Sequence, residues 1–146
     1  MAVEPKILNN VIKKLSLKVA YTPNENDEYA LAFSTQKGTK ESPFYSGADS
    51  FERYWRWPMW DKDSIYFLSH TEFDDHHLTL NTKAFYDTFK NDLRAFDDAT
   101  FSTQKKKSSF NSYYRDYSYG AGFDLGGDLT SKDRLKFSTL IKYDVH

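Results

Sequence analysis

Apolar and polar side chains alternate along much of this chain, and this period of two is the feature that most constrains its fold. Between Leu15 and Tyr21, for example, every second residue is apolar. Six stretches follow the pattern: Leu15–Tyr21, Tyr29–Gln36, Ser64–Phe73, Leu78–Asp87, Tyr117–Gly126 and Leu135–Asp144. Because successive side chains of a β-strand point to opposite faces, the pattern predicts about six strands, each with one apolar and one polar face.

The composition favours the same structural class. Aromatic residues make up 18% of the 146 residues, with 11 Tyr and 12 Phe, although hydrophobic residues of all kinds reach only 39%. Tyr, Phe and Thr fit the half-buried surface of a pleated sheet. A disordered chain is poor in aromatic residues, so we do not expect disorder.

The connections between the predicted strands differ in length. Short polar turns lie at Thr22–Asp27, Asp74–His77 and Gly126–Asp133, and long connections lie at about 37–62 and 91–109. Short turns at one end and long loops at the other indicate an antiparallel up-and-down meander. We therefore predict an all-β chain in which residues 13–146 form the meander and residues 1–12 form an N-terminal extension.

Two kinds of protein share this pattern. One is a transmembrane β-barrel, whose strands are apolar towards lipid and polar towards the lumen. The other is a soluble antiparallel sheet with one wet face, such as a lipocalin-like module that binds a small apolar or aromatic ligand. Tyrosines near the ends of the predicted strands would suit the aromatic girdles of a barrel, but tyrosines are also common there in soluble sheets.

The alternation also predicts which side chains share a face. One face should carry Leu15, Leu17, Val19, Leu31, Phe33, Phe123, Phe137 and Ile141. The other should carry Lys18, Lys83, Asp124, Lys136 and Lys142. Six strands are too few to close a barrel around those charges, since small membrane barrels have about eight strands. If the chain lies in a membrane, we expect it to be a slice of a larger barrel.

The tryptophan-rich segment Arg53–Phe67 is the most specific feature of the chain, and it resembles a segment of the β-barrel of TonB-dependent outer-membrane receptors. Weaker likenesses occur in the same order along the chain at Pro23–Leu31, Phe85–Leu93, Phe96–Thr100, Tyr113–Gly120 and Ile141–His146. Together they cover most of the chain from about Leu15 to His146.

The resemblance implies a fold, a location and partners. The family forms barrels of about 22 strands in the bacterial outer membrane and takes up iron-siderophores or similar scarce nutrients. Its export signal, TonB box and plug domain have no counterpart in this chain, so we expect a segment of the barrel that does not transport by itself. The implied partners are outer-membrane lipid, the other strands and plug of a parent barrel, and a metal-chelate ligand. TonB would be a partner of the parent receptor only.

The best candidates for ligand binding lie in the tryptophan-rich segment. They are Tyr54, Trp55, Arg56, Trp57 and Trp60. Trp and Arg are enriched where proteins recognise ligands, and an Arg side chain can stack on an aromatic ring. An aromatic belt or an anchor for the loop would use the same residues. In an extended segment Trp55 and Trp57 should point to one side and Arg56 to the other.

Other functions find little support in the sequence. A net charge of −1 argues against nucleic-acid binding, which relies on many Lys and Arg contacts to phosphate. Cysteine is absent, and no run approaches the roughly 20 apolar residues of a transmembrane helix. We find no catalytic motif, so we expect no enzyme, no cofactor and no metal site. The acids at 97–98 and the lysines at 105–107 are expected to be solvated loop residues.

Overall fold

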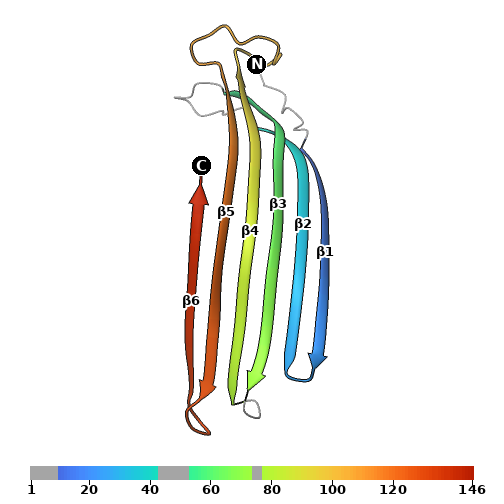
Figure 1. Cartoon of the computed structure of the whole chain (residues 1–146). Coiled ribbons are helices and arrows are strands. Elements are labelled where there is room, and N and C mark those ends of the chain that lie inside the picture. Colours follow the sequence, from blue (N-terminus) through green and yellow to red (C-terminus); the bar gives the residue numbers. More distant parts are fainter. Residues whose placement is uncertain (1–9, 43–52, 74–76) are drawn as a thin grey trace. The chain divides into compact units, whose positions relative to one another are not determined.

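The chain forms a single antiparallel sheet with its strands in sequence order (Figure 1). The computed structural model describes residues 10–42, 53–73 and 77–146. The strands are β1 (Val11–Asn24), β2 (Asp27–Glu41), β3 (Tyr54–Phe73), β4 (Leu78–Phe96), β5 (Phe110–Asp128) and β6 (Arg134–Val145). The described residues contain no helix, so the predicted all-β meander of six strands is confirmed.

The strands are longer than the alternation alone predicted. β2 continues to Glu41 and β3 begins at Tyr54, so the first connection is 42–53 rather than 37–62. The second connection is 97–109 rather than 91–109, because β4 continues to Phe96. Residues 11 and 12 also belong to a strand rather than to the expected extension. These added segments lack strict alternation or contain Pro58. Their backbones can still pair with a neighbouring strand, because a face of an antiparallel sheet can be exposed to solvent and then accepts polar side chains.

The described residues fall into two compact units. Unit 1 comprises those within Met1–Lys14, Gln36–Lys62 and Phe89–Arg115. Unit 2 comprises those within Leu15–Thr35, Asp63–Thr88 and Asp116–His146. Of the long connections, residues 42, 53 and 97–109 belong to unit 1, and the described residues of the short turns belong to unit 2. Residues 43–52 of the first predicted loop and 74–76 of the second predicted turn lie outside the described residues.

In unit 2 the register of β5 and β6 identifies one apolar face. Phe123 pairs with Thr139, Leu125 pairs with Phe137, and Ala121 pairs with Ile141. Directly paired residues of an antiparallel sheet share a face. The neighbouring pair of Asp124 with Ser138 therefore belongs to the opposite face, together with Lys136 and Lys142.

Side-chain contacts carry the same two faces across the other strands of unit 2. Tyr86 of β4 stacks on Tyr117 of β5, and the hydroxyl groups of Ser69 and Thr82 are 2.6 Å apart. The Thr35 hydroxyl donates a hydrogen bond of 2.6 Å to Asp63. Thr35 is an even number of positions from Leu31 and Phe33 in β2. Asp63 and Ser69 are likewise an even number of positions from Ile65 and Phe67 in β3. All of these side chains therefore lie on the apolar face.

The polar face is connected in the same way. The Lys18 ammonium group lies 3.8 Å from the Glu28 carboxylate, and the Tyr66 hydroxyl donates a hydrogen bond of 2.9 Å to Asp87. Since Lys18 lies on the polar face, its neighbours Leu17 and Val19 lie on the apolar one. The eight apolar residues predicted to share a face do so, and the charged set shares the other.

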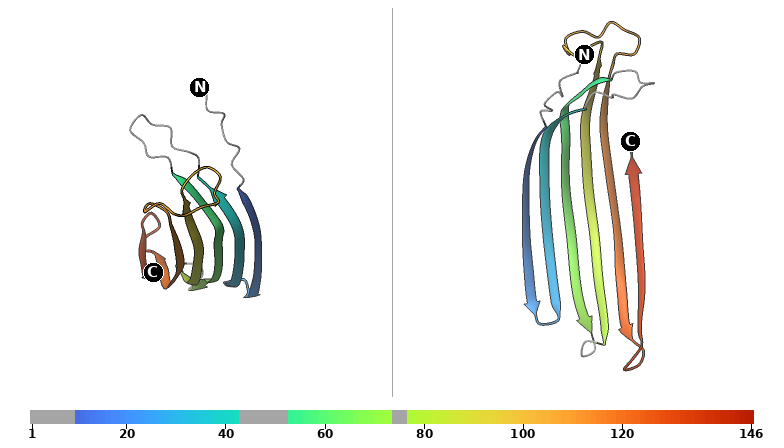
Figure 2. Two further views of the ribbon diagram at one scale, coloured as in Figure 1. Left: turned by 90° about the horizontal axis from the view of Figure 1, so that it is seen from above. Right: turned by 180° about the vertical axis from the view of Figure 1, so that it is seen from behind.

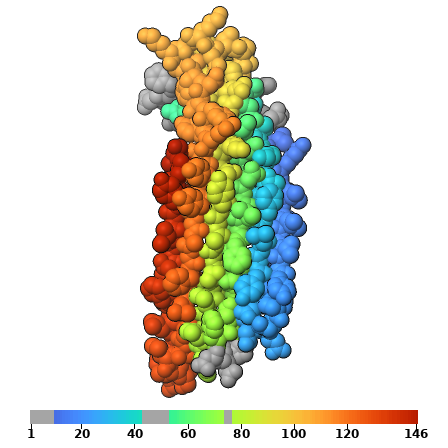
Figure 3. Space-filling view, viewed as in Figure 1, coloured from blue at the N-terminus to red at the C-terminus, as the bar shows by residue number. Residues whose placement is uncertain are grey.

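Among the residues that the structure describes, no second layer covers either face of unit 2. In the space-filling view the strands appear as successive coloured stripes (Figure 3), and the ribbon seen from behind shows no element over them (Figure 2). Ile141 is 77% exposed, Leu15 is 63% exposed and Phe137 is 58% exposed. The charged face is open too, with the Lys18 side chain 55% exposed. The few buried apolar residues of the described chain are Ala30, Ala95 and Phe101.

Candidate functional site

The predicted binding residues lie at the beginning of β3, in unit 1. The rings of Trp55 and Trp57 are 6.0 Å apart, in an edge-to-face arrangement. Tyr54 and Arg56 instead meet the ring of Phe101, with the Arg56 guanidinium carbon 3.8 Å from its centroid. The prediction that Trp55 and Trp57 share one side and Arg56 takes the other is confirmed.

The three tryptophans and two phenylalanines form a continuous group that we call the tryptophan cluster. Its members are Trp55, Trp57, Trp60, Phe89 and Phe110. The closest pair is Trp60 and Phe89, whose centroids are 4.9 Å apart. Each edge-to-face pair contributes about 0.5–1.5 kcal/mol beyond the burial of its area. The cluster therefore joins β3 to β4 and β5 by aromatic packing.

Regular alternation fails within this segment. Trp57 and Trp60 are three positions apart, which would place them on opposite faces of a regular strand. Their rings are nevertheless 6.1 Å apart, and the ammonium group of Lys40 lies 5.2 Å from the centroid of Trp57 and 4.8 Å from that of Trp60. The break coincides with Pro58, which cannot donate a hydrogen bond to a neighbouring strand. It brings Trp60 to the same cation as Trp57.

Arg56 lies between a carboxylate and an aromatic ring. Its Nε lies 2.9 Å from Glu41, a side chain that is only 13% exposed, and its guanidinium plane lies against Phe101. Arg94 is held in a similar way, because its Nε and Nη2 both donate to Asp92, at 3.0 and 2.7 Å. Arg56 thus lies beside a carboxylate of the neighbouring strand β2, and Arg94 is held by a carboxylate of its own strand, β4.

Arg56 and Arg94 line one hollow, which we call the arginine hollow. Its volume is about 280 Å³, and its lining residues are Thr39, Lys40, Glu41, Arg56, Trp57, Pro58, Arg94 and Phe96. The lining includes three cationic side chains and one carboxylate. Of the five predicted site residues, Arg56 and Trp57 line this hollow. Trp55 and Trp60 belong to the tryptophan cluster, and Tyr54 packs against Phe101.

The loop after β4 is ordered around Asp97. The Asp97 carboxylate accepts hydrogen bonds from the main-chain N–H groups of Lys105 and Lys106, at 2.7 and 2.9 Å, and from the Ser109 hydroxyl. The Ser109 hydroxyl first, and then the two N–H groups, hold the pKa of Asp97 well below its usual range. The acid expected to be solvated is instead a buried loop anchor.

Phe101 has a backbone conformation that is uncommon for its type. Its φ of 54° lies in the left-handed region, where residues other than glycine are rare. Its ring packs edge-to-face against Tyr54 and Phe96 and lies under Arg56. This packing compensates for the backbone conformation and ties the loop to the start of β3. We call Tyr54, Arg56, Phe96 and Phe101 the Phe101 cluster.

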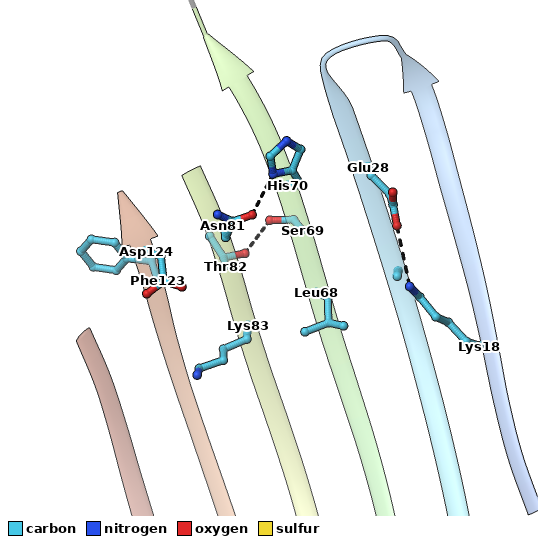
Figure 4. Close-up of a pocket in the computed structure, with 11 residues that line it drawn as sticks. Lys18, Glu28, Leu68, Ser69, His70, Asn81, Thr82, Lys83, Phe123 and Asp124 are labelled. Atoms are coloured by element: carbon cyan, nitrogen blue, oxygen red, sulfur yellow. Dashed lines mark hydrogen bonds and ion pairs between the residues drawn. The ribbon is translucent and has the colours of Figure 1, made fainter. Parts of the chain in front are cut away.

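A second hollow, of about 330 Å³, lies in unit 2 (Figure 4). Its polar groups mostly satisfy one another: Lys18 pairs with Glu28, and His70 bonds to Asn81 at 2.7 Å. Apolar lining comes from Ala30, Leu68 and Phe123. The closely paired polar groups leave this hollow less suited than the arginine hollow to recognising a charged ligand.

Sequence reasoning missed several residues of these sites. The alternation places Glu41 and Arg94 in loops, and the charge pattern predicts that Asp97 is solvated. A local signal existed only for the turn next to Asp97, because an Asp followed two residues later by Thr favours the tight turn that Asp98 and Thr100 make here. The meeting of Arg56 with Phe101 had no local signal, since the two residues are distant in sequence.

The described residues hold no group of three or more His, Cys, Asp or Glu side chains arranged to bind a metal. Nor do they form a helix long and apolar enough to cross a membrane. Comparison of the sequence with models of protein families finds no match, and comparisons with curated proteins and with solved structures find none either.

Proposed function

We propose that this chain is part of the wall of an outer-membrane β-barrel of the TonB-dependent receptor type. The observation that carries the proposal is the uncovered apolar face of unit 2. A water-soluble monomer rarely exposes a continuous apolar surface larger than a few hundred Å². Here Leu15, Leu17, Leu135, Phe137 and Ile141 are each 58–77% exposed. Lipid is the solvent that suits such a face.

A row of tyrosines supports the same proposal. On the apolar face Tyr86 contacts Tyr117, Tyr117 contacts Tyr119, and Tyr119 contacts Tyr143, with ring centroids 6.1, 6.5 and 5.4 Å apart. The amphipathic rings of such a row suit the boundary between lipid and water. Along β6, Leu135 to Tyr143 spans about 27 Å at 3.4 Å per residue. That length is close to the roughly 25 Å apolar band of outer-membrane barrels.

The two sheet edges define the partners that the proposal needs. Among the described strands, β1 and β6 each have only one neighbour. In lipid an unpaired backbone group costs several kcal/mol, so both edges would require further strands. We assign these strands, and a plug, to a parent barrel, and TonB to that parent receptor only. The bacterial outer membrane is the location that follows.

Unit 1 supplies the features that suit capture of a ligand. It holds the tryptophan cluster and the arginine hollow, both outside the apolar stretch of unit 2. Together with the resemblance of Arg53–Phe67 to the receptor family, they support uptake of an iron-siderophore or a similar scarce nutrient. In this proposal the chain contributes binding surface and wall, and the parent receptor performs transport.

Lipid contact at two adjacent residues tests the membrane proposal. The chain has no cysteine, so a single introduced cysteine can be labelled cleanly. We would place a fluorescent label at Ile141→Cys or at Leu140→Cys and refold the full chain in phosphatidylcholine vesicles, where the free edges of β1 and β6 can pair with those of other copies of the chain. Nitroxide-labelled lipid would be added as a quencher. Ile141 lies on the apolar face, and its neighbour Leu140, paired with Gly122, lies on the opposite one.

We expect strong quenching at position 141 and weak quenching at position 140. Equal quenching at both positions, or none at either, would contradict the placement of the apolar face in lipid. A second candidate function, a soluble lipocalin-like binding module, is favoured by the hollow of unit 2 and its Leu68 and Phe123 lining. That candidate predicts a chain that stays dispersed without vesicles and shows no lipid quenching.

A further inference from the structure

The two arginines that line the hollow lie beside carboxylates that do not use all of their donors. Arg56 Nε lies 2.9 Å from the Glu41 carboxylate, yet this buried nitrogen has no hydrogen-bond partner among the described residues. Arg94 pairs with Asp92, which is not part of the lining. Lys40 also belongs to the lining, although its ammonium group lies over Trp57 and Trp60. A group that carries negative charge would satisfy the unpaired donor of Arg56.

The arginines also retain donors for such a group. A guanidinium has five N–H donors arranged as a rigid fork. The adjacent carboxylates use only part of them: Glu41 lies beside Arg56 Nε without accepting a hydrogen bond from it, and Asp92 accepts hydrogen bonds from Nε and Nη2 of Arg94. Arg56 still has both terminal nitrogens beyond that contact, and Arg94 still has Nη1. Planar oxyanions are the ligands that match a guanidinium fork.

Both arginines are oriented before any ligand arrives. One carboxylate oxygen of Asp92 accepts two hydrogen bonds from Arg94. The Glu41 carboxylate lies beside the Nε edge of Arg56, and the Phe101 ring lies against the face of its guanidinium group. A side chain that is already held loses less conformational entropy when it binds. The same contacts explain why two cations can lie along one hollow, since each has a carboxylate beside it.

We propose that the arginine hollow binds an oxyanion, a carboxylate or phosphate group of the ligand, between Arg56 and Arg94. The inference rests on the proposed function and deepens it by naming the chemistry of the captured ligand. Lys40 adds long-range attraction while its ammonium group lies over Trp57 and Trp60. Phe96 supplies an apolar wall for the carbon skeleton of the ligand.

Intrinsic tryptophan fluorescence provides the assay. All three tryptophans of the chain lie in unit 1, and Trp57 lines the hollow. The full chain in phosphatidylcholine vesicles would be titrated with citrate, with inorganic phosphate and with triethyl citrate, which keeps the skeleton but has no charge. We expect a saturable change with citrate or phosphate, weakened by added salt, and none with the neutral ester. Which of the two anions binds more tightly distinguishes a carboxylate site from a phosphate site.

Substitutions locate the site. Arg94→Gln and Arg56→Gln should each weaken anion binding about 10- to 100-fold, the effect of losing hydrogen bonds to a charged group. Arg115→Gln is the matched control, because Arg115 is also in unit 1 but contacts Tyr113 and does not line the hollow. The control should bind like the unchanged chain. Circular dichroism in the same vesicles verifies that each variant keeps its sheet.

The outcomes separate the two proposals. No saturable response to either anion in the unchanged chain, or equal binding by the ester, would overturn the oxyanion site without needing any variant. Binding that survives Arg56→Gln combined with Arg94→Gln would do the same. Anion binding together with no lipid quenching at position 141 would overturn the membrane proposal and leave the oxyanion site standing.

Discussion

The guanidinium carbon of Arg56 lies 3.8 Å from the ring centroid of Phe101, and this contact joins the start of β3 to the loop that follows β4. Phe101 is 9% exposed and keeps a left-handed backbone conformation. Stacking of a cation on a ring contributes about 0.5–1 kcal/mol at exposed sites and more where water is excluded. One aromatic side chain thus determines both the shape of the loop and the position of an arginine that lines the hollow.

Phe101→Ala should release the loop without unfolding the sheet. Removal of a buried Phe costs about 3–5 kcal/mol, and here the cost would fall on local opening. We expect hydrogen exchange at the amides of Lys105 and Lys106 to accelerate at least about 100-fold. Lys107→Ala at the exposed tip is the control and should leave that exchange unchanged. Unaltered protection in Phe101→Ala would show that the ring does not hold the loop.

The loop should resist mild acid and open in strong acid. Asp97 has a lowered pKa in the folded loop, so its contribution is fully present above the pKa of an unfolded Asp, about 3.9. That contribution is lost as the pH falls towards the folded-state pKa. Amide spectra of Lys105 and Lys106 recorded against pH would follow the change. In Asp97→Asn we expect weaker protection at neutral pH and little further change below pH about 4; an unchanged acid transition would assign it to another group.

A charge on the apolar face should hinder insertion into lipid. Ile141→Arg should cost about 2–4 kcal/mol if residue 141 lies near the middle of the bilayer. Leu140→Arg, on the opposite face of the same strand, is the matched control and should cost far less. The urea dependence of folding into phosphatidylcholine vesicles measures both. Equal costs at the two positions would argue against a lipid-facing side.

The close approach of β5 and β6 at Gly120 predicts an effect on strand pairing. A Cβ at this position would lie 2.5 Å from the carbonyl oxygen of Ile141 and 2.8 Å from the ring of Phe85. Gly120→Ala should therefore destabilise the pairing of β6 by about 1–3 kcal/mol, as other overpacked sites do. Faster hydrogen exchange in β6 would report it, and Ser118→Ala on the same face should leave β6 unaffected. A neutral Gly120→Ala would mean that Phe85 moves aside without cost.

The substitution Trp57→Ala distinguishes a role of this ring in packing from a role in ligand binding. Trp57 is half-buried against Trp55 and Trp60, so we expect a cost of about 1–3 kcal/mol, below the 3–5 kcal/mol of a fully buried ring. Trp57→Phe should recover most of it. Stability measured in urea and anion binding measured by the remaining tryptophans give the two readouts. Lost binding with unchanged stability would assign the ring to recognition alone.

The alternation of apolar and polar residues predicted which side chains share a face of the sheet. It missed the contacts between residues that are distant in sequence. It placed Ile141 and Lys142 on opposite faces and Trp55 and Trp57 on the same side, because the pleat fixes these relations locally. It ended the strands too early around Pro58, where the rings of Trp57 and Trp60 meet out of period. The arginine hollow required Arg94, Glu41 and Arg56 to converge from three strands, and no single-sequence pattern encodes that convergence.

Several of the hydrogen bonds that hold the loop at residues 97–109 end on main-chain groups. Asp97 grips the amides of residues 105 and 106, and the Gln104 side chain reaches the Ala95 carbonyl at 2.9 Å. A main-chain N–H group is the same hydrogen-bond donor whatever side chain its residue carries, proline excepted. Positions 105 and 107 can therefore change in sequence while the loop keeps its conformation. The loop is therefore suited to serve as a scaffold for grafting. A short foreign epitope inserted at its tip would be held in a defined conformation while the rest of the loop keeps its structure.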